Sequence, residues 1–346
     1  MSLITLRQLL DHAAEHDYAM PAFNINNMEQ AQAVMEAADE TGSPALLCAS
    51  SSARSYAGDH FLYGVMQAAM TSYQHIPVCL HQDHGLSPEM CKSSIDLGFS
   101  SAMMDGSLLP DHKTPSDYEY NVRVTKEVSD YAHDHGASTE GEIGVLGSLE
   151  TLAAGKEDGV GAEGKLTEDM LLTSVEEAVD FAEKTNVDAL AIAIGTSHGA
   201  YKFTEPPTGK VLRIDRLIEI HKALPNTHLV MHGSSSVPQD WLQIINENGG
   251  KMGQTYGVPV EEIQEGIRNG VRKVNVDTDL RMASTGAIRQ YFVENPEQFD
   301  PRKYLSVAKD AMKEICKERY EAFGAAGKAD KITDIKTLEE MRSYYK

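Results

Sequence analysis

Eight short apolar runs, each ending in polar residues, constrain the fold of this chain more than any other feature of its sequence. Stretches with helical periodicity separate most of them, such as MEQAQAVMEAADETG from Met28 and TSVEEAVDFAEKTN from Thr173, which stop at Gly and Asn. Strands that alternate with helices form a parallel sheet, and eight such units form a closed (β/α)8 barrel. The runs begin at Ala19, Pro44, Ile76, Ser100, Ala137, Asp188, His228 and Val271.

We therefore predict a single α/β domain over residues 1–346, a TIM barrel with extra C-terminal helices. A doubly wound open sheet is the alternative, but no G-x-G-x-x-G motif follows the first strand. Residues 299–324 repeat apolar side chains at helical spacing, which is typical of a helix that covers the barrel or contacts another subunit. In a barrel, all the strand ends meet at one mouth, so the polar tails converge there.

The composition excludes several classes of partner. A formal charge of −21 repels nucleic acid and anionic membrane surfaces. No stretch approaches the roughly 18 apolar residues of a membrane span, and Arg7 and Asp11 interrupt the apolar face that a signal peptide would need. The four cysteines lack C-x-x-C spacing, so we expect them to be reduced. The chain is typical of a cytoplasmic protein.

Three of the 13 histidines share one local pattern at the ends of predicted strands. His84, His198 and His232 are each followed by glycine, in the triplets DHG, SHG and MHG. Three imidazoles at one barrel mouth supply the usual three protein ligands of a catalytic zinc ion, whose fourth position stays open. A single histidine of this kind is more often a hydrogen-bonded core residue, but the repeated pattern favours a metal site.

Carboxylates accompany these histidines at the strand ends. Asp83 directly precedes His84, and a turn of the backbone there would let Asp83 face a substrate while His84 binds metal. The spacing fits equally a general acid/base or a group that orients a ligand. Asp105 and Glu142 fit either further metal ligands or ordinary hydrogen-bonded carboxylates. His81 lies within its strand and is interpreted as a structural neighbour or as a group that orients a metal ligand.

The last two strand ends, HGSSS and NVDTD, indicate a phosphate site, because loops after strands seven and eight of barrels frequently hold phosphate. Small residues with exposed N–H groups form a nest for anions. Such a nest, together with zinc, would hold a phosphate inside an acidic protein. Two ordinary polar turns are the alternative interpretation. The nest would comprise Gly233, Ser234, Ser235, Asp277 and Thr278, with Gly199 from strand six.

A long glycine-rich connection, GSLETLAAGKEDGVGAEGKLT, runs from Gly147. Loops of this length in a compact fold are usually lids or disordered insertions. Glu150 lies near its start, within reach of the mouth if the loop closes.

With these residues in place, the sequence resembles the class II, zinc-dependent fructose-1,6-bisphosphate aldolases. The turn HGSSSVP and the tail FDPRKYL are similar to the branch found with Calvin-cycle enzymes. The resemblance extends from PAFNINN at Pro21 to DPRKY at Asp300. It implies reversible cleavage of fructose 1,6-bisphosphate to dihydroxyacetone phosphate and glyceraldehyde 3-phosphate.

The resemblance also implies a role for each matching residue. His84, His198 and His232 would bind the catalytic zinc. Asp105 and Glu142 would provide the carboxylates of an alternate metal site. Asp83 would exchange the proton of the C4 hydroxyl, and Glu150 the proton on dihydroxyacetone phosphate. A monovalent cation is a further expectation. The matching substrate-binding residues are Ser50, Gly199, Gly233, Ser234, Ser235, Asn275, Val276, Asp277, Thr278 and Arg302.

Arg302 would reach the second phosphate from a neighbouring subunit, which predicts a homo-oligomer, a dimer or a higher even-numbered assembly. Two positions depart from the family pattern. Ser148 stands where the commoner loop has glycine, and Ser234 also replaces a common glycine. Because this loop departs from the family pattern, the match at Glu150 is weaker than the match at the three histidines.

Several alternatives stay open from the sequence. Tagatose 1,6-bisphosphate and sedoheptulose 1,7-bisphosphate share the dihydroxyacetone-phosphate half of the substrate. A zinc hydrolase would activate water instead of a ketone, and a non-catalytic barrel would only bind sugar phosphates. Aldolases of the other type use a Schiff-base lysine, for which an inward-facing Lys273 is the formal candidate.

Overall fold

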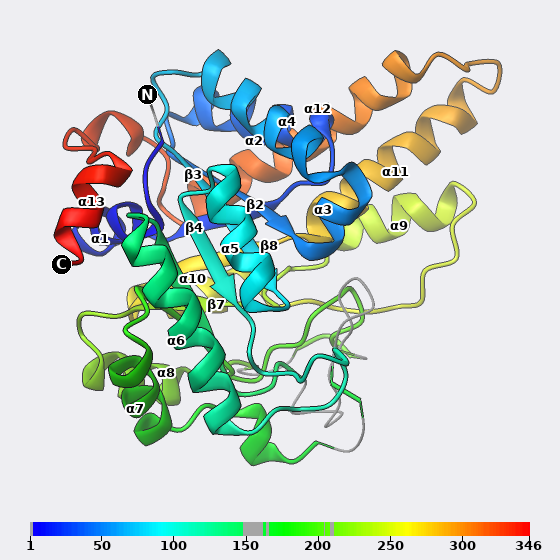
Figure 1. Cartoon of the computed structure of the whole chain (residues 1–346). Coiled ribbons are helices and arrows are strands. Elements are labelled where there is room, and N and C mark those ends of the chain that lie inside the picture. Colours follow the sequence, from blue (N-terminus) through cyan, green and yellow to red (C-terminus); the bar gives the residue numbers. More distant parts are fainter. Residues whose placement is uncertain (1–2, 148–161, 164–165, 204, 208–210) are drawn as a thin grey trace.

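A closed parallel barrel of eight strands forms the centre of the protein (Figure 1). The computed structural model describes residues 3–147, 162–163, 166–203, 205–207 and 211–346. Each strand pairs with its neighbours in sequence, and β1 pairs with β8, so the predicted TIM barrel and all eight predicted strands are confirmed. The strands are β1 (Met20–Asn24), β2 (Ala45–Ser50), β3 (Val78–Gly85), β4 (Ser101–Met104), β5 (Ser138–Ile143), β6 (Ala189–Ile192), β7 (His228–Met231) and β8 (Val271–Val276).

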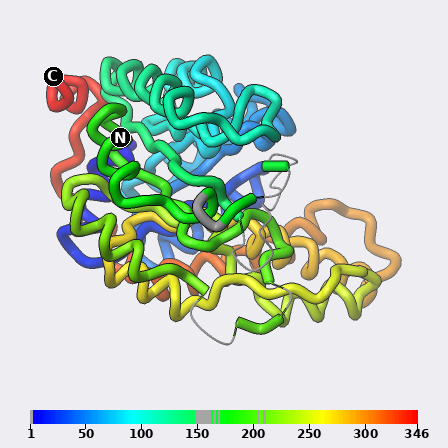
Figure 2. The backbone as a smooth tube through the Cα atoms, turned by 90° about the horizontal axis from the view of Figure 1, so that it is seen from below, coloured from blue at the N-terminus to red at the C-terminus, as the bar shows by residue number. Residues whose placement is uncertain are grey.

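Helices surround the barrel as an outer layer, as the end-on tube in Figure 2 also shows. The helices are α1 (Leu6–Glu15), α2 (Met28–Thr41), α3 (Ser51–Ala57), α4 (Asp59–Ser72), α5 (Pro88–Leu97), α6 (Tyr118–Asp134), α7 (Val175–Thr185), α8 (Ile214–Ala223), α9 (Gln239–Glu247), α10 (Val260–Arg268), α11 (Thr278–Glu294), α12 (Pro301–Ala322) and α13 (Leu338–Tyr344), with 3-10 turns η1 (Glu168–Leu171) and η2 (Ala329–Lys331). None of the helices among the described residues is both long and apolar enough to span a membrane.

Local sequence signals explain where the helices begin and end. The side chain of Asn27 accepts a hydrogen bond from the backbone of α2, and Ser87 does the same for α5. Gly42 and Asn186 end α2 and α7 in the left-handed conformation, at the stops that the sequence predicted. The boundaries of these helices therefore follow from capping chemistry.

The end of the barrel opposite the mouth is filled by α1. This helix contacts β3, β5, β7 and β8, and it buries Leu6, Leu9, Leu10 and Ala13 against them. Hydrophobic side chains on one helical face thus close the barrel at its N-terminal end. The polar ends of the strands lie at the other opening.

The long helix α12 packs against α2 and α11, and α11 and α12 together form an arm that projects beyond the barrel (Figures 1 and 2). Ala308, Met312 and Ile315 of α12 are buried, which confirms the predicted covering helix. Arg302 lies in the first turn of α12 with a side chain that is 88% exposed, and its guanidinium pairs with Asp300.

Candidate active site

Three imidazoles meet at the barrel mouth, as the sequence predicted. His84 is the penultimate residue of β3, His232 directly follows β7, and His198 lies in the loop after β6. One ring nitrogen of each lies within 4.8 Å of the others, and among the described residues this is the group that could hold a metal ion. The ring of His84 lies edge-on to both other rings, with centroid distances of 4.7 and 4.6 Å. Three elements far apart in sequence therefore build one site.

A β-bulge explains how two consecutive side chains of β3 both reach the mouth. Side chains of a regular strand alternate between faces, so Asp83 and His84 would point apart. The register against β4 shifts between Gln82 and Gly85, and His84 adopts a left-handed φ of 43°. A bulge bends its strand and re-aims a side chain. The turn expected at this strand end is therefore present within the last residues of β3.

The hydrogen bonds of the imidazoles fix which nitrogen faces the centre of the cluster. Nδ1 of His84 lies 2.9 Å from Asp105 Oδ2, and Nε2 of His232 lies 2.8 Å from Glu140 Oε1. An ionised carboxylate only accepts hydrogen bonds, so these two nitrogens carry the N–H groups. The amide nitrogen of Asn275 lies 3.2 Å from His232 Nδ1, which accordingly presents a lone pair.

The donor set fits a metal ion. His84 Nε2 and His232 Nδ1 lie 2.8 Å apart, and in the tautomers fixed by the carboxylates both carry lone pairs. Two lone pairs at this distance repel unless a proton or a cation lies between them. Imidazoles held from behind by carboxylates, with their free nitrogens converging, are the arrangement that zinc prefers. The cluster at His84, His198 and His232 therefore fits zinc.

The acid groups around His84 and the basic groups around His232 give the two imidazoles opposite pKa shifts. Burial lowers the pKa of His84, but the charges of Asp83 and Asp105 outweigh burial and raise it well above its usual value. Burial lowers the pKa of His232, and the positive charge of Lys273 lowers it further. The carboxylates of Asp83 and Asp105 therefore attract a proton or a cation that lies between the two rings.

Asp83 is a buried carboxylate, 1% exposed, beside this cluster. Its oxygens accept hydrogen bonds from the side-chain amides of Asn24 and Asn275, at 3.0 Å each. Burial would raise the pKa of Asp83, but the positive charges of His84 and Lys273 outweigh it and lower the pKa below its usual range. Asp83 is therefore ionised in this arrangement, and the two amides hold its proton-accepting oxygens in place beside the cluster.

An ion pair lies inside the barrel below the imidazoles. The ammonium of Lys273 lies 2.8 and 3.1 Å from the two carboxylate oxygens of Glu140, and both residues are fully buried. Burial lowers the pKa of Lys273, but the charges of Glu140 and Asp83 raise it above its usual value. An ammonium cannot attack a carbonyl, so this lysine is in the wrong form for a Schiff base.

The sequence interpretation missed Glu140, although the run ASTEGEIG had been singled out for Glu142. The signal was present, because residues two apart on a strand point to the same side, and both carboxylates therefore face the interior. Lys273 is inward-facing, which the sequence left open. His81, 3.5 Å from Glu140, is the structural neighbour that the sequence predicted.

Asp105 and Glu142 lie beside the cluster in different protonation environments. Asp105 bonds His84 and accepts from the backbone and hydroxyl of Ser107, at 3.1 and 2.6 Å. Glu142 is 2% exposed, and its Oε2 has no hydrogen-bond partner in the described part of the chain. Burial, and then the charge of Asp105, raise the pKa of Glu142 well above its usual value. Their role at an alternate metal position stays a prediction.

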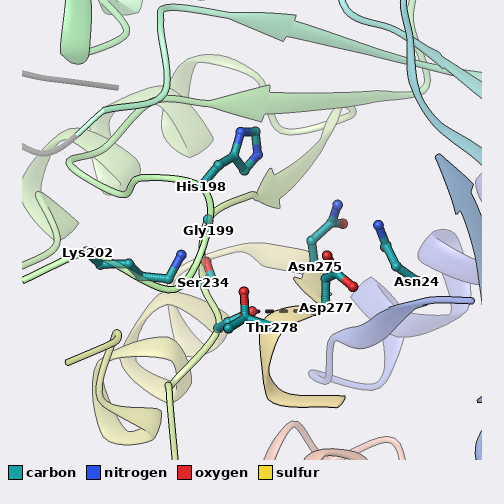
Figure 3. Close-up of a pocket in the computed structure, with 10 residues that line it drawn as sticks. Asn24, His198, Gly199, Lys202, Ser234, Asn275, Asp277 and Thr278 are labelled. Carbon is teal, nitrogen blue, oxygen red and sulfur yellow. Dashed lines mark hydrogen bonds between the residues drawn. The ribbon is translucent and has the colours of Figure 1, made fainter. Parts of the chain in front are cut away.

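A polar pocket opens beside His198 at the ends of β6, β7 and β8 (Figure 3). Gly233 has a φ of 64°, and a Cβ there would meet the carbonyl oxygen of Ser197 at 2.7 Å, so the turn requires glycine. The pocket is lined by Asn24, His198, Gly199, Lys202, Gly233, Ser234, Ser235, Asn275, Asp277 and Thr278. All six residues of the predicted anion nest are therefore brought together.

Lys202 is the cationic residue of this pocket, and the sequence interpretation missed it. Its side chain is 3% exposed and donates a hydrogen bond to the carbonyl oxygen of Ser197. In the sequence it follows SHGAY in a loop, where a lysine is ordinarily at the surface. The only available signal was its spacing of three residues from Gly199.

Ser50, Val276 and Arg302 are predicted substrate-binding residues that do not line this pocket. Ser50 pairs in register with Asp83 across β2 and β3, and its hydroxyl caps α3. Val276 is buried at the end of β8. Arg302 lies on the arm described above. Glu150 lies outside the described residues.

The fold and the site define a TIM-barrel protein with a three-histidine cluster of the kind that holds zinc. The family described as fructose-bisphosphate aldolase class-II matches residues 4–328. A fructose-bisphosphate aldolase of Stutzerimonas stutzeri is 64% identical over 345 residues, covering 100% of this chain and 97% of that protein. The fructose-bisphosphate aldolase class 2 of a Synechocystis species is 59% identical over 345 residues, covering 100% and 96%.

Among solved structures, the YdjI aldolase from Escherichia coli K12 superposes with a TM-score of 0.71 at 27% identity, covering 94% of this chain and 99% of that one. The chain belongs to the class II fructose-bisphosphate aldolase family. The resemblance that the sequence motifs suggested is thereby confirmed.

Proposed function

We propose that this protein catalyses the reversible aldol cleavage of fructose 1,6-bisphosphate to dihydroxyacetone phosphate and glyceraldehyde 3-phosphate. Besides family membership, one observation supports this proposal most: the ionised carboxylate of Asp83 lies buried beside three converging imidazoles and an anion nest. This set combines a base, a metal site and a phosphate site within one mouth.

His84, His198 and His232 would hold the zinc ion. When bound, zinc supplies Lewis-acid polarisation of the substrate ketone and stabilises the negative charge that develops on it. Asp105 and Glu140 hold the imidazoles of His84 and His232 in the tautomers that binding requires. Asp105 and Glu142 would serve an alternate metal position, and a monovalent cation would complete the proposed ion set.

Asp83 would accept the proton of the C4 hydroxyl. The electrons of that O–H bond form the aldehyde carbonyl, the C3–C4 bond breaks, and its electron pair remains on the dihydroxyacetone-phosphate fragment. The amides of Asn24 and Asn275 hold the carboxylate in place during this transfer. Glu150 would return a proton to C3, a role that stands on the resemblance alone.

The pocket after β6–β8 would bind the phosphate of the dihydroxyacetone half. Backbone N–H groups of Gly199, Gly233, Ser234, Ser235 and Thr278 offer hydrogen bonds, and Lys202 offers a positive charge. These local dipoles and this charge act at short range, so they outweigh the repulsion from a net charge of −21. Asn275 would face the reacting carbons, and Val276 and Asp277 would contact the dihydroxyacetone-phosphate half.

Ser50 and Arg302 would serve the other half of the substrate, with Arg302 reaching the second phosphate from a neighbouring subunit. This role requires a homo-oligomer, for which we expect a dimer or a higher even-numbered assembly, and gel filtration with light scattering would detect it. A monomer at the assay concentration that cleaves substrate with an unchanged KM after Arg302→Ala would contradict the role of Arg302. The cytoplasmic location stays a prediction.

The proposed function is tested by measuring triose-phosphate release from fructose 1,6-bisphosphate before chelation, after chelation and after zinc is restored. We expect activity, its loss and its recovery. Parallel assays with tagatose 1,6-bisphosphate and sedoheptulose 1,7-bisphosphate compare the other sugars. Release of inorganic phosphate would indicate a hydrolase, and tight binding without turnover would indicate a binding barrel. Cleavage that survives complete removal of metal would refute the metal mechanism.

A further inference from the structure

The bulge in β3 is held from outside the barrel by groups that the reaction itself does not use. Gln82 and Ala102 are paired, and Gly85 pairs with Met104, so Asp83 and His84 together oppose a single residue of β4. A bulge disrupts the regular ladder of hydrogen bonds and leaves backbone groups to find other partners. The two residues of the bulge are the proposed base and a proposed zinc ligand.

Side chains bond the carbonyl oxygens of both bulge residues. Nε2 of Gln82 donates to the carbonyl of Asp83 at 2.9 Å, and the hydroxyl of Ser51 donates to the carbonyl of His84 at 2.8 Å. The left-handed φ of His84, 43°, is costly for a residue with a β-carbon, so surrounding contacts must maintain it. Gln82 and Ser51 supply two of these contacts.

Arg54 in α3 fixes the side chain of Gln82 in turn. Its Nη1 donates to Gln82 Oε1 at 2.9 Å and to Ser94 Oγ at 2.6 Å, and Ser94 also donates to Gln82 at 2.8 Å. The remaining guanidinium nitrogens pair with Asp59 at 2.8 Å. Arg54 is 7% exposed and Gln82 is fully buried. With its oxygen occupied by two donors, the amide of Gln82 can only present its NH2 group to Asp83.

We propose that Gln82, held by Arg54, is a positioning residue that fixes the β3 bulge and thereby directs both Asp83 and His84 into the mouth. The proposal rests on the proposed function for the roles of those two side chains. Most residues of the phosphate pocket follow β6, β7 and β8, and Gln82 and Arg54 do not line it, so we expect the clamp to act mainly on the metal and base geometry. A displacement of even 1 Å at reacting groups costs about 100-fold in rate.

The test is Gln82→Glu, which keeps the oxygen that accepts from Arg54 and Ser94 and removes the N–H donor to the Asp83 carbonyl. In the zinc-loaded protein we expect kcat to fall about 10–100-fold and the KM for fructose 1,6-bisphosphate to stay within about twofold. The cobalt-loaded protein gives a second readout, because the visible absorption of cobalt, unlike zinc, reports ligand geometry. We expect its bands to shift.

Arg54→Met should change kcat and the cobalt spectrum in the same direction, and Asp59→Asn is the matched control. Asp59 is 47% exposed and touches Arg54 only on the side away from Gln82, so its variant should keep both readouts. Thermal unfolding of the metal-free proteins identifies a variant that has merely lost stability. A folded Gln82→Glu protein with wild-type kcat and cobalt spectrum would overturn the clamp.

The failure of the proposed function would be distinguishable from the failure of the clamp. If the wild-type protein does not cleave the sugar, the proposed substrate is wrong, yet the cobalt comparison still tests the geometry of the bulge. If the wild-type protein cleaves it and the variants match the wild type in both readouts, only the clamp is wrong.

Discussion

The two sides of the barrel mouth recognise charge by different means. On the β3–β5 side, ionisable side chains such as Asp83, Asp105 and Glu140 are buried and cross-linked by short hydrogen bonds to imidazoles and amides. On the β6–β8 side, half of the residues that line the pocket are glycine, serine or threonine, and Lys202 is its lysine. One side consists of paired, buried charges, and the other combines small polar residues with one lysine.

The difference teaches which part of the reaction each side can serve. Buried charges cost free energy unless they are paired, so the β3–β5 side is stable only as a complete network. Backbone N–H groups keep their dipoles whatever the side chains are, so the β6–β8 side tolerates single changes better. Substitutions in the network of buried charges, to which His232 also belongs through Glu140, should therefore affect metal and kcat, and those in the polar pocket should affect KM.

His232→Ala should have the largest effect. It removes a proposed zinc ligand and leaves Glu140 without its imidazole partner, so we expect tight metal binding and cleavage both to be lost. Metal content after gel filtration and triose-phosphate release measure the two losses. A variant that retains one tightly bound zinc per chain would count against the three-histidine site.

Asp83→Asn should follow, since it removes a base without changing the size of the side chain. We expect kcat to fall about 100–10,000-fold, the range in which a positioned general base contributes, with zinc content unchanged. Steady-state kinetics and metal analysis on the same preparation check both parts. Full activity at normal zinc content would show that Asp83 only orients other groups.

Lys202→Met crosses to the other side of the mouth and should act on binding. A hydrogen bond to a charged group is worth about 1.5–3 kcal/mol, so we expect KM to rise about 10–100-fold. Zinc content should stay at the wild-type level. Inhibition of the variant and the wild type by the same concentration of inorganic phosphate would contradict the proposal that Lys202 binds the phosphate.

Ser235→Ala should have the smallest effect. The backbone N–H group remains, so only the hydroxyl is lost, and we expect KM to rise about 2–10-fold. The same assay with Thr278→Ser serves as a control, because serine retains the hydroxyl. A loss of kcat in Ser235→Ala, with KM unchanged, would remove the distinction between the two sides.

The sequence predicted the barrel because its strands end in polar residues and helices such as α2 and α7 begin and end at ordinary capping residues. The same pattern predicted that His84, His198 and His232 lie close together, because parallel strands of a barrel all end at one opening. The expectation held even for His198, which lies in the loop beyond β6 and not at the strand end itself.

The sequence did not reveal which side chains contact one another inside the barrel. Glu140 and Lys273 lie in different strands, and neither is recognisable as half of an ion pair until the ring closes. Lys202 and Arg54 resemble the surface cations of any acidic protein, because burial in loops and short helices has no periodicity to reveal it. Gln82 lies between two ionisable residues in the sequence, but it contacts Arg54 of α3 and Ser94 of α5, which the sequence alone does not place beside it.

The pairing of β1 with β8 has a consequence for how the protein is made. His84 and His232 are 148 positions apart, and the ring closes only through β8, which begins at Val271. A ribosome adds about 5–20 residues per second, so a growing chain spends many seconds with its early histidines exposed and no matching partner. Metal uptake must therefore come late in synthesis, and during refolding it would report the moment at which the ring closes.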